Sequence, residues 1–227
     1  MKTNPYPGRG IVIGCSEDGK RTVMLYFIMG RSVNSRNRVF EKTIDGIRTK
    51  AYDPSKLTDP SLVIYSPVRT YLGRTIVTNG DQTDTIYEHL INERDFRTAL
   101  MTRDFEPDPP NYTPRISGLI NRDGSYNLSI LKAAYGDPAY CFRYFFEYPA
   151  AIPGLGHFIS TYISDGDPLP SFEGEPVPVS ITVADGIEKF ANTVWKAMDK
   201  DNKVSLYVRE TVIETGKSSE VIINKNQ

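Results

Sequence analysis

Apolar residues fall in short runs that alternate with turn signals along most of the 227-residue chain. Three pairs stand between such runs, Asp18-Gly19, Asp45-Gly46 and Asp123-Gly124, and each predicts an antiparallel hairpin. β-Branched and aromatic residues dominate the flanking runs, as is typical of strands. The pattern predicts strands over residues 10–15, 22–29, 38–44, 47–52, 62–65, 74–78, 116–121, 126–133, 140–148, 158–163, 204–212 and 220–223.

Two segments repeat their apolar residues at helical spacing. The first runs from about residue 82 to about residue 103, with a break near Asp95. The second runs from about residue 186 to 199 and includes Trp195, which its spacing assigns to the core rather than to a ligand site. Asp185 and Glu188 resemble a capping box at its start. These elements predict one α+β domain over residues 1–227, with two stacked, mostly antiparallel sheets and the helices outside.

Composition narrows the class of protein. Hydrophobic residues make up 39% and charged residues 24%, as in a soluble globular protein, and the formal net charge is −1. Because no global basic field exists, we expect no nucleic-acid partner. No apolar run approaches membrane-spanning length, and the residues before Gly10 contain no apolar leader segment. The two cysteines, Cys15 and Cys141, predict no disulfide framework, so we expect a cytoplasmic protein without a membrane partner.

Residues 104–118 concentrate polar side chains between four prolines. Proline fixes φ and removes a backbone donor, so the segment is expected to be a stiff, extended loop that presents polar groups. Crowded carboxylates raise one another's pKa, which suits a general acid or base near neutral pH. A plain surface linker is the alternative interpretation. The candidate residues are Asp104, Glu106, Asp108, Asn111, Thr113 and Arg115.

Two further segments offer groups for a nucleotide. Residues 30–38 interleave three arginines with serine and asparagine, which favours a phosphate site over a solvated basic loop. Asn79, Gly80 and Asp81 join a strand to a helix, and the acidic character there favours a ribose hydroxyl or carboxamide over phosphate. Asp81 as a simple helix N-cap is the alternative. Residues 165–178 predict a long loop, either a lid or a plain connection.

Several common chemistries have no sequence signature here. The two histidines lack zinc-ligand spacing, and neither a GxGxxG nor a P-loop motif occurs. No GxSxG occurs, which argues against an α/β-hydrolase nucleophile.

These segments, in this order, resemble the archaeal-type inosine monophosphate (IMP) cyclohydrolase family over about residues 8–162. The resemblance implies an N-terminal-nucleophile-hydrolase-like fold, a four-layer α-β-β-α sandwich. It also implies ring closure of 5-formamidoimidazole-4-carboxamide ribonucleotide to IMP with loss of water, the last step of de novo purine synthesis. The matching pieces are Gly8-Arg9-Gly10, Arg31-Ser32, Arg36, Tyr65, Asn79-Gly80, Thr83-Asp84-Thr85-Ile86, Glu106, Asp108, Thr113-Pro114-Arg115-Ile116 and Ile159-Ser160-Thr161-Tyr162.

The resemblance leads to an assignment of roles. Glu106 transfers a proton, Tyr65 donates to the formyl oxygen, and Asp108 helps to position both Glu106 and the substrate. The substrate-binding residues are Arg31, Ser32 and Arg36 for the phosphate, Asn79, Gly80 and Asp81 for the ribose or base, and Asn111 and Arg115 for other polar groups. No metal or organic cofactor is expected. The loop over residues 32–38 is longer than in the archaeal form.

We expect a purine ribonucleotide as the small-molecule partner, and a homo-oligomer in which the aromatic residues 140–148 form either interface or core. Two other function classes remain open. One is a different amidohydrolase or cyclohydrolase on the same fold. The other is a non-catalytic purine-nucleotide-binding protein, in which Glu106 would be dispensable.

Overall fold

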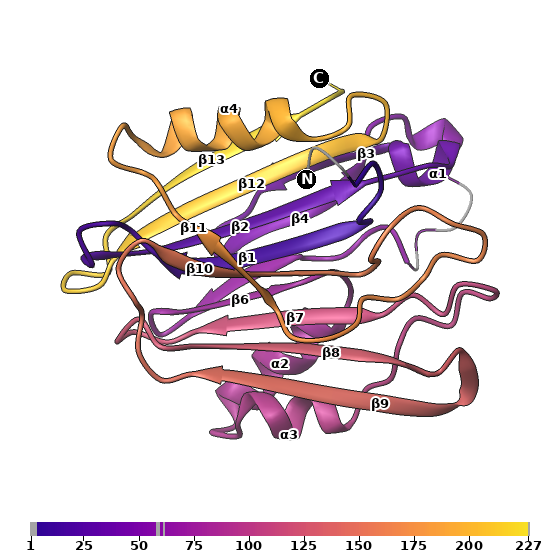
Figure 1. Ribbon diagram of the computed structural model, residues 1–227, viewed down its shortest axis with the longest axis horizontal. Helices are drawn as coiled ribbons and strands as arrows, with labels where there is room; N and C mark the ends of the chain where they lie inside the picture. The colour runs from indigo at the N-terminus through magenta and orange to yellow at the C-terminus, as the bar shows by residue number, and fades with distance from the viewer. Residues whose placement is uncertain (1–3, 58–59, 61, 227) are drawn as a thin grey trace.

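The computed structural model describes residues 4–57, 60 and 62–226, so the first three residues of the segment considered for a leader lie outside it. Two antiparallel sheets face each other, with one helix on the outer side of the first and a helix pair on the outer side of the second (Figure 1). The predicted α+β class with two antiparallel sheets is therefore confirmed. No helix among the described residues is long and apolar enough to cross a membrane.

The six-stranded sheet combines strands from both ends of the chain. Strands β1 and β2 are buried almost throughout, because one face meets the second sheet and the other meets α4 (Ile187–Ala197) and the segments beside it. Its order is β11 (Val177–Ser180), β10 (Leu155–Ser160), β1 (Arg9–Cys15), β2 (Arg21–Met29), β12 (Lys203–Val212) and β13 (Ser218–Asn224).

The seven-stranded sheet follows the chain order. Its outer face is covered by α2 (Gln82–Ile91) and α3 (Phe96–Met101). The core between the two sheets contains side chains from both sheets. Its strands are β3 (Arg38–Lys42), β4 (Gly46–Ala51), β5 (Val68–Tyr71), β6 (Arg74–Thr78), β7 (Arg115–Ile120), β8 (Tyr126–Ala134) and β9 (Asp137–Tyr148). Short helices α1 (Val33–Arg36) and η1 (Pro54–Lys56) lie in the connections.

Most local predictions are confirmed. All three Asp-Gly pairs join neighbouring antiparallel strands, β1–β2, β3–β4 and β7–β8. The break in the first helical segment falls at Asp95, whose carboxylate accepts a hydrogen bond from the Thr98 N–H at 2.6 Å and so begins α3. Trp195 packs, half-buried, against the core cluster beneath α4.

The strand predicted over residues 62–65 is wrong. These residues form a turn and an irregular segment between Pro60 and Pro67. Tyr65 still reaches β4, because the Thr49 N–H donates to its carbonyl and its own N–H donates to the Thr49 hydroxyl, both at 2.8 Å. A side-chain hydroxyl thus replaces part of a strand ladder. The strand in this region is β5, and β5 and β11 were not predicted.

The predicted capping box at the last helix is also wrong. Gly186, with φ of +97°, is the N-cap of α4, and no side chain caps the helix. The Asp185 carboxylate instead accepts from Lys189 at 2.5 Å. A positive φ favours glycine, which has no Cβ to clash. The conformation of Gly186 therefore sets the direction in which the chain enters the helix, without a capping side chain.

Candidate active site

Buried polar residues from both sheets gather at one end of the sandwich, where β1, β3 and β7 begin and β6 ends, toward the right in Figure 1. Antiparallel pairing brings these chain-distant points together, since Gly10 pairs with Ser160 and Thr78 pairs with Ser117. We call this group the polar cluster. It comprises Arg9, Tyr26, Arg38, Tyr65, Asn79, Gln82, Glu106, Thr113, Arg115 and Tyr162.

Glu106 lies at the centre of the polar cluster and is only 3% exposed. Its Oε1 accepts from Arg9 Nη2 at 2.6 Å and from Asn79 Nδ2 at 3.2 Å. Burial raises the pKa of Glu106, and the positive charges of Arg9 and Arg115 oppose that rise. A carboxyl group with a raised pKa can take up and return a proton near neutral pH. Crowding by other carboxylates, which the sequence suggested, contributes less than burial to this shift.

The Asn79 side chain makes four hydrogen bonds, one of them to Glu106. Its Nδ2 donates to Glu106 and to the Pro114 carbonyl at 2.9 Å. Its Oδ1 accepts from Gln82 Nε2 at 3.0 Å and from the Ile116 N–H at 2.8 Å. Both hydrogens and both lone pairs of the amide are thereby used within the protein.

Arg115 extends this network toward the surface. Its Nη1 donates to Gln82 Oε1 and pairs with Asp81 Oδ1, both at 2.6 Å. Asp81 is the N-cap residue of α2, as the alternative predicted, but its side chain makes no cap; its other oxygen accepts from Arg103 at 2.5 Å. A Cβ on Gly80 would lie 2.5 Å from Arg115 Nη1, so only glycine allows this close packing.

Four hydroxyl groups complete the cluster. The Tyr26 and Tyr65 hydroxyls lie 2.7 Å apart, and burial raises the pKa of both, so both stay protonated. The Thr113 hydroxyl donates to Asp108 Oδ2 at 2.5 Å. The Tyr162 hydroxyl, 2.6 Å from Thr113 Oγ1, must therefore be the donor in that contact. Asp108 thus orders the loop beside Glu106.

Arg38 is a buried cation without a carboxylate partner among the residues that the structure describes. It is 3% exposed, and its Nε donates to the Ser35 carbonyl at 2.9 Å. Burial lowers its pKa, and the nearby charge of Arg9 lowers it further. The polar cluster therefore holds three buried arginines, Arg9, Arg38 and Arg115, and one buried carboxylate, Glu106. A buried charge without compensation is costly, so the site favours an anionic ligand.

The three residues expected to bind phosphate lie outside the polar cluster, exposed and engaged with the protein. Arg31 Nη1 donates to Asp165 Oδ1 at 2.5 Å and to the Gly166 carbonyl at 3.0 Å. Ser32 caps α1. Arg36 donates to the Gly30 carbonyl at 2.8 Å and to Asn202 Oδ1 at 3.0 Å. Their role in phosphate binding stays a prediction.

Residues 163–170, called the strap here, follow β10 and lie, partly exposed, beside the loop that carries Glu106. Asn111 Oδ1 accepts from the Leu169 N–H at 3.1 Å and ties the strap to the loop that carries Glu106. A cavity of about 700 Å³ opens on the outer side, lined by Asn111, Lys132, Tyr144 and Leu169 among others. The cavity adjoins the loop that carries Glu106, because Asn111 lines it, so it is the candidate approach for a ligand.

Asp165→Asn is expected to loosen the strap, because it removes the charge of an ion pair with Arg31. Exposed pairs of this kind contribute up to about 1 kcal/mol, so backbone amides of the strap should exchange up to about fivefold faster. Hydrogen exchange followed by mass spectrometry measures this. Asp185→Asn, which removes an exposed pair with Lys189 far from the strap, is the matched control. Unchanged exchange would make the strap a plain connection.

Several cluster residues were not singled out from the sequence as site residues: Arg9, Tyr26, Arg38, Gln82 and Tyr162. Two had a signal. Arg9 and Tyr162 stand within pieces of the family resemblance. Arg38 also had one, because it shares the buried face of β3 with Phe40 two residues on, whereas Arg36 lies before the strand. An arginine on an inward strand face is a stronger site candidate than one in a loop.

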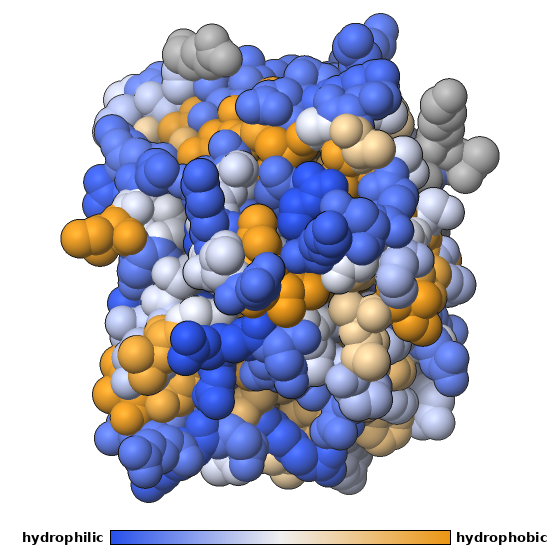
Figure 2. Space-filling view, turned by 90° about the vertical axis from the view of Figure 1, so that its left-hand side faces the viewer, coloured by the Kyte–Doolittle hydropathy of each residue, from blue (hydrophilic) through white to orange (hydrophobic). Residues whose placement is uncertain are grey.

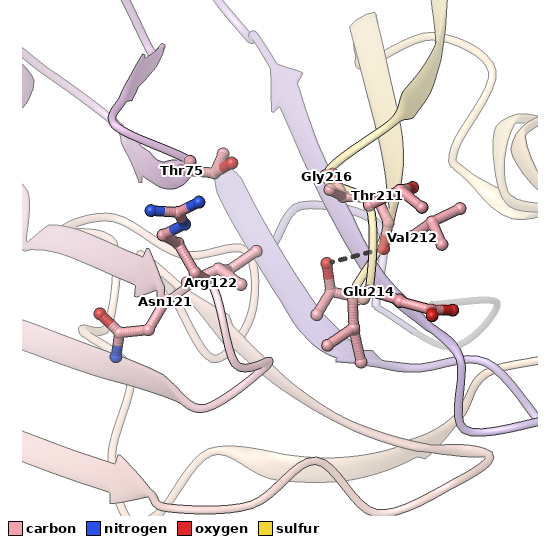
Figure 3. Close-up of a pocket in the computed structure, with 12 residues that line it drawn as sticks. Thr75, Asn121, Arg122, Thr211, Val212, Glu214 and Gly216 are labelled. Atoms are coloured by element: carbon pink, nitrogen blue, oxygen red, sulfur yellow. Dashed lines mark hydrogen bonds between the residues drawn. The ribbon is translucent and has the colours of Figure 1, made fainter.

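The opposite end of the sheets faces the viewer in Figure 2, where polar residues predominate and apolar ones are scattered. A cavity of about 300 Å³ lies there, lined by Thr75, Arg122, Thr211 and Glu214 among others (Figure 3). The Glu214 carboxylate points away from Arg122, so the charges do not converge on one ligand position. Among the described residues, no three His, Cys, Asp or Glu side chains group as a metal site would require. The polar cluster is the better candidate site.

Comparison with known proteins gives one consistent result. Residues 6–216 match the model of a family described as IMP cyclohydrolase-like protein. The IMP cyclohydrolase of Methanococcus aeolicus is 30% identical over 125 residues, 53% of this chain and 61% of the relative. The IMP cyclohydrolase of Halobacterium salinarum is 33% identical over 132 residues, which cover 56% of this chain and 63% of the relative. The IMP cyclohydrolase of Methanopyrus kandleri is 34% identical over 116 residues, which cover 49% of this chain and 57% of the relative. The chain thus matches less than two thirds of the length of these relatives.

Proposed function

The chain belongs to the IMP cyclohydrolase-like family, and on that premise we propose that it closes the ring of 5-formamidoimidazole-4-carboxamide ribonucleotide to give IMP and water. Purine biosynthesis is then its setting. The observation that carries the proposal is Glu106, a buried carboxyl group with a raised pKa, held between Arg9 and Asn79 in a cluster that also contains the buried Arg38. The site offers both a proton carrier and a place for an anion.

Glu106 is the proton carrier in this proposal. The carboxamide nitrogen attacks the formyl carbon, a carbon–nitrogen bond forms, and the formyl oxygen becomes a hydroxyl group. Glu106 takes a proton from the carboxamide nitrogen and delivers it to the formyl oxygen, which gives this hydroxyl group. Glu106 then takes the proton of the former formamide nitrogen and delivers it to the hydroxyl, which leaves as water while a carbon–nitrogen double bond forms. Atoms and charge balance without a covalent intermediate, a metal ion or a cofactor. General acid–base catalysis of this kind contributes about 10²–10⁴-fold to the rate.

Tyr65 is the donor to the formyl oxygen. Its hydroxyl stays protonated, and the Tyr26 hydroxyl at 2.7 Å fixes its direction. Charge that develops on the formyl oxygen is stabilised by such a fixed donor in a water-free site. Asn79 and Asp108 position Glu106 and its loop. Holding the formyl group in the cyclising rotamer is the larger task and can be worth up to about 7–11 kcal/mol.

The phosphate is assigned first to Arg38. Its guanidinium is buried and lacks a carboxylate among the described residues, and guanidinium groups bind phosphate with two parallel hydrogen bonds. Arg31, Ser32 and Arg36 rank behind it, because all three are exposed and the charges of the two arginines are already solvated. Asp81, half exposed, can accept from a ribose hydroxyl, with Gly80 allowing Arg115 to pack beside Asp81 and Asn111 at the approach.

Four further features belong to the proposal. The four layers of Figure 1 support an N-terminal-nucleophile-hydrolase-like fold formed as one domain over residues 1–227. The net charge of −1 supports a small purine ribonucleotide rather than nucleic acid as partner. The protein works in the cytoplasm, without a membrane partner. It does so as a homo-oligomer.

An absorbance assay tests the function. Purified protein is mixed with the formylated carboxamide ribonucleotide, without added metal, and IMP formation is followed against the spontaneous rate. Turnover above that rate supports the proposal. Thermal stabilisation by IMP without turnover would leave a nucleotide-binding protein. Turnover only of other formamides or cyclic amides would point to a different cyclohydrolase or amidohydrolase.

A further inference from the structure

Strand β9 (Asp137–Tyr148) forms an open edge of the seven-stranded sheet, at the bottom front of Figure 1. It is 12 residues long and pairs on one side with β8. On the other side, none of its backbone groups has a backbone hydrogen-bond partner within the described part of the chain. A long unpaired edge of this kind is a template for another strand.

The two halves of β9 differ in how they are protected against pairing. The first half carries Pro138, and a proline on an edge strand blocks the addition of a further strand. The second half, residues 142–148, carries five aromatic residues and only two charges, Arg143 and Glu147. Tyr144 is 43% exposed, and the Glu147 side chain lies at the surface. This half lacks the protecting residues of an edge that stays single.

We propose that residues 142–148 pair antiparallel with the same residues of a second copy of this chain, about a two-fold axis at Phe145. In this register Arg143 of each copy lies opposite Glu147 of the other. Tyr144 lies opposite Phe146, and Phe142 lies opposite Tyr148. Opposite charges and aromatic pairs directly across two strands stabilise a sheet, so the segment is complementary to itself. The two seven-stranded sheets then form one continuous sheet.

Other two-fold registers of this strand are less complementary. An axis at Arg143 or at Glu147 sets like charges against each other, which destabilises the pair. An axis at Tyr144 or Phe146 leaves neither charge opposite its counterpart. Because one register alone satisfies both charges, the segment specifies a second copy of itself rather than an unrelated strand.

Arg143 has donors left for this contact. Its Nη2 donates to Asp104 at 2.5 Å and to the Arg103 carbonyl at 2.8 Å. Its Nη1 makes only a 3.5 Å contact with the Cys141 carbonyl. Because a guanidinium group carries five N–H donors, Arg143 can keep its present partners and still donate to a carboxylate of the second copy.

Charge reversal tests the proposal by sedimentation velocity or by light scattering after gel filtration. The wild-type protein should have twice the chain mass of 25.5 kDa, or a larger even multiple. Glu147→Arg sets two arginines opposite each other at both ends of the pairing. It should therefore halve the mass of the assembly in solution. The double variant Arg143→Glu/Glu147→Arg restores opposite charges and should recover the wild-type mass. Glu214→Arg, the same charge change on the β12–β13 hairpin, should change nothing.

Two measurements keep the test decisive. Circular dichroism should show an unchanged fold for Glu147→Arg, because the side chain is exposed and carries no ion pair within the described residues. Hydrogen exchange at residues 142–148 should be faster in Glu147→Arg than in the wild type. A monomeric wild-type protein, an assembly that Glu147→Arg leaves intact, or a double variant that stays dissociated would overturn the proposal.

Discussion

Glu106→Gln is expected to lower kcat for ring closure by about 10²–10⁴-fold with little change in KM. Glutamine keeps the shape of the side chain and can still accept from Asn79, but it cannot carry a proton. The loss should therefore fall on the chemical step rather than on substrate binding. Steady-state kinetics by the absorbance assay measure both constants. Normal turnover in this variant would remove Glu106 from proton transfer.

Stability must be followed in the same variant. Glutamine leaves the Arg9 guanidinium, 2.6 Å away, without a counter-charge in a buried site, and removing one partner of a buried pair costs about 3–5 kcal/mol. Loss of activity with loss of folding would prove nothing about catalysis. Glu106→Asp is the control, because it keeps the charge and only withdraws the carboxylate by one methylene. A folded Glu106→Asp protein with strongly reduced kcat would separate geometry from stability.

The pKa of Glu106 predicts the shape of the pH profile. Burial raises this pKa above its ordinary value, and proton uptake from the substrate requires the ionised form. Activity should therefore fall with decreasing pH, through a pKa higher than that of an exposed carboxyl group. The folded state also holds this proton more tightly than the unfolded state does. The free energy of unfolding should therefore fall as pH rises from the ordinary to the raised pKa, and Glu106→Gln should abolish that slope.

The fold could be predicted where local chemistry decides it. Asp-Gly pairs make tight hairpins regardless of what surrounds them, so Asp18-Gly19, Asp45-Gly46 and Asp123-Gly124 fixed the pairing of their flanking strands. Residues 62–65 are apolar enough for a strand but lie between prolines, and the hydroxyl of Thr49, far away in sequence, determines how Tyr65 is held. A long-range side-chain contact of that kind leaves no local trace.

The candidate site was also predicted only in part, because local sequence shows polar segments but not the long-range contacts between them. Glu106 and Arg115 were identified because a rigid loop rich in polar groups suits chemistry, and Asn79 because it joins a strand to a helix. The three do contact or face one another. Arg9 pairs with Glu106 across 97 residues of sequence, a contact that only the packing of the two sheets creates. Composition alone also could not say which arginine between residues 30 and 38 points inward. The pairing of β3 with β4 decides that.

Arg38→Met is expected to raise KM for the ribonucleotide by about 30-fold or more while leaving kcat nearly unchanged, and to make the ligand-free protein no less stable. A buried charged hydrogen bond is worth about 2–5 kcal/mol on truncation, which sets the binding loss. Replacing a buried charge by an apolar side chain of similar size is neutral or stabilising by about 1–4 kcal/mol. Kinetics and thermal unfolding measure the two effects.

Arg38→Met is informative because it should weaken substrate binding and yet leave the stability of the ligand-free protein unchanged or higher. A purely structural arginine would lower stability on removal, and a surface arginine would change neither quantity. Arg36→Met is the matched control: Arg36 lies two residues away, is exposed, and donates to Gly30 and Asn202. If Arg36→Met raises KM and Arg38→Met does not, the phosphate lies at the exposed loop, as the sequence first suggested. If Arg38→Met raises KM and keeps or gains stability, then the buried charge of Arg38, costly in the ligand-free protein, is there to bind the phosphate.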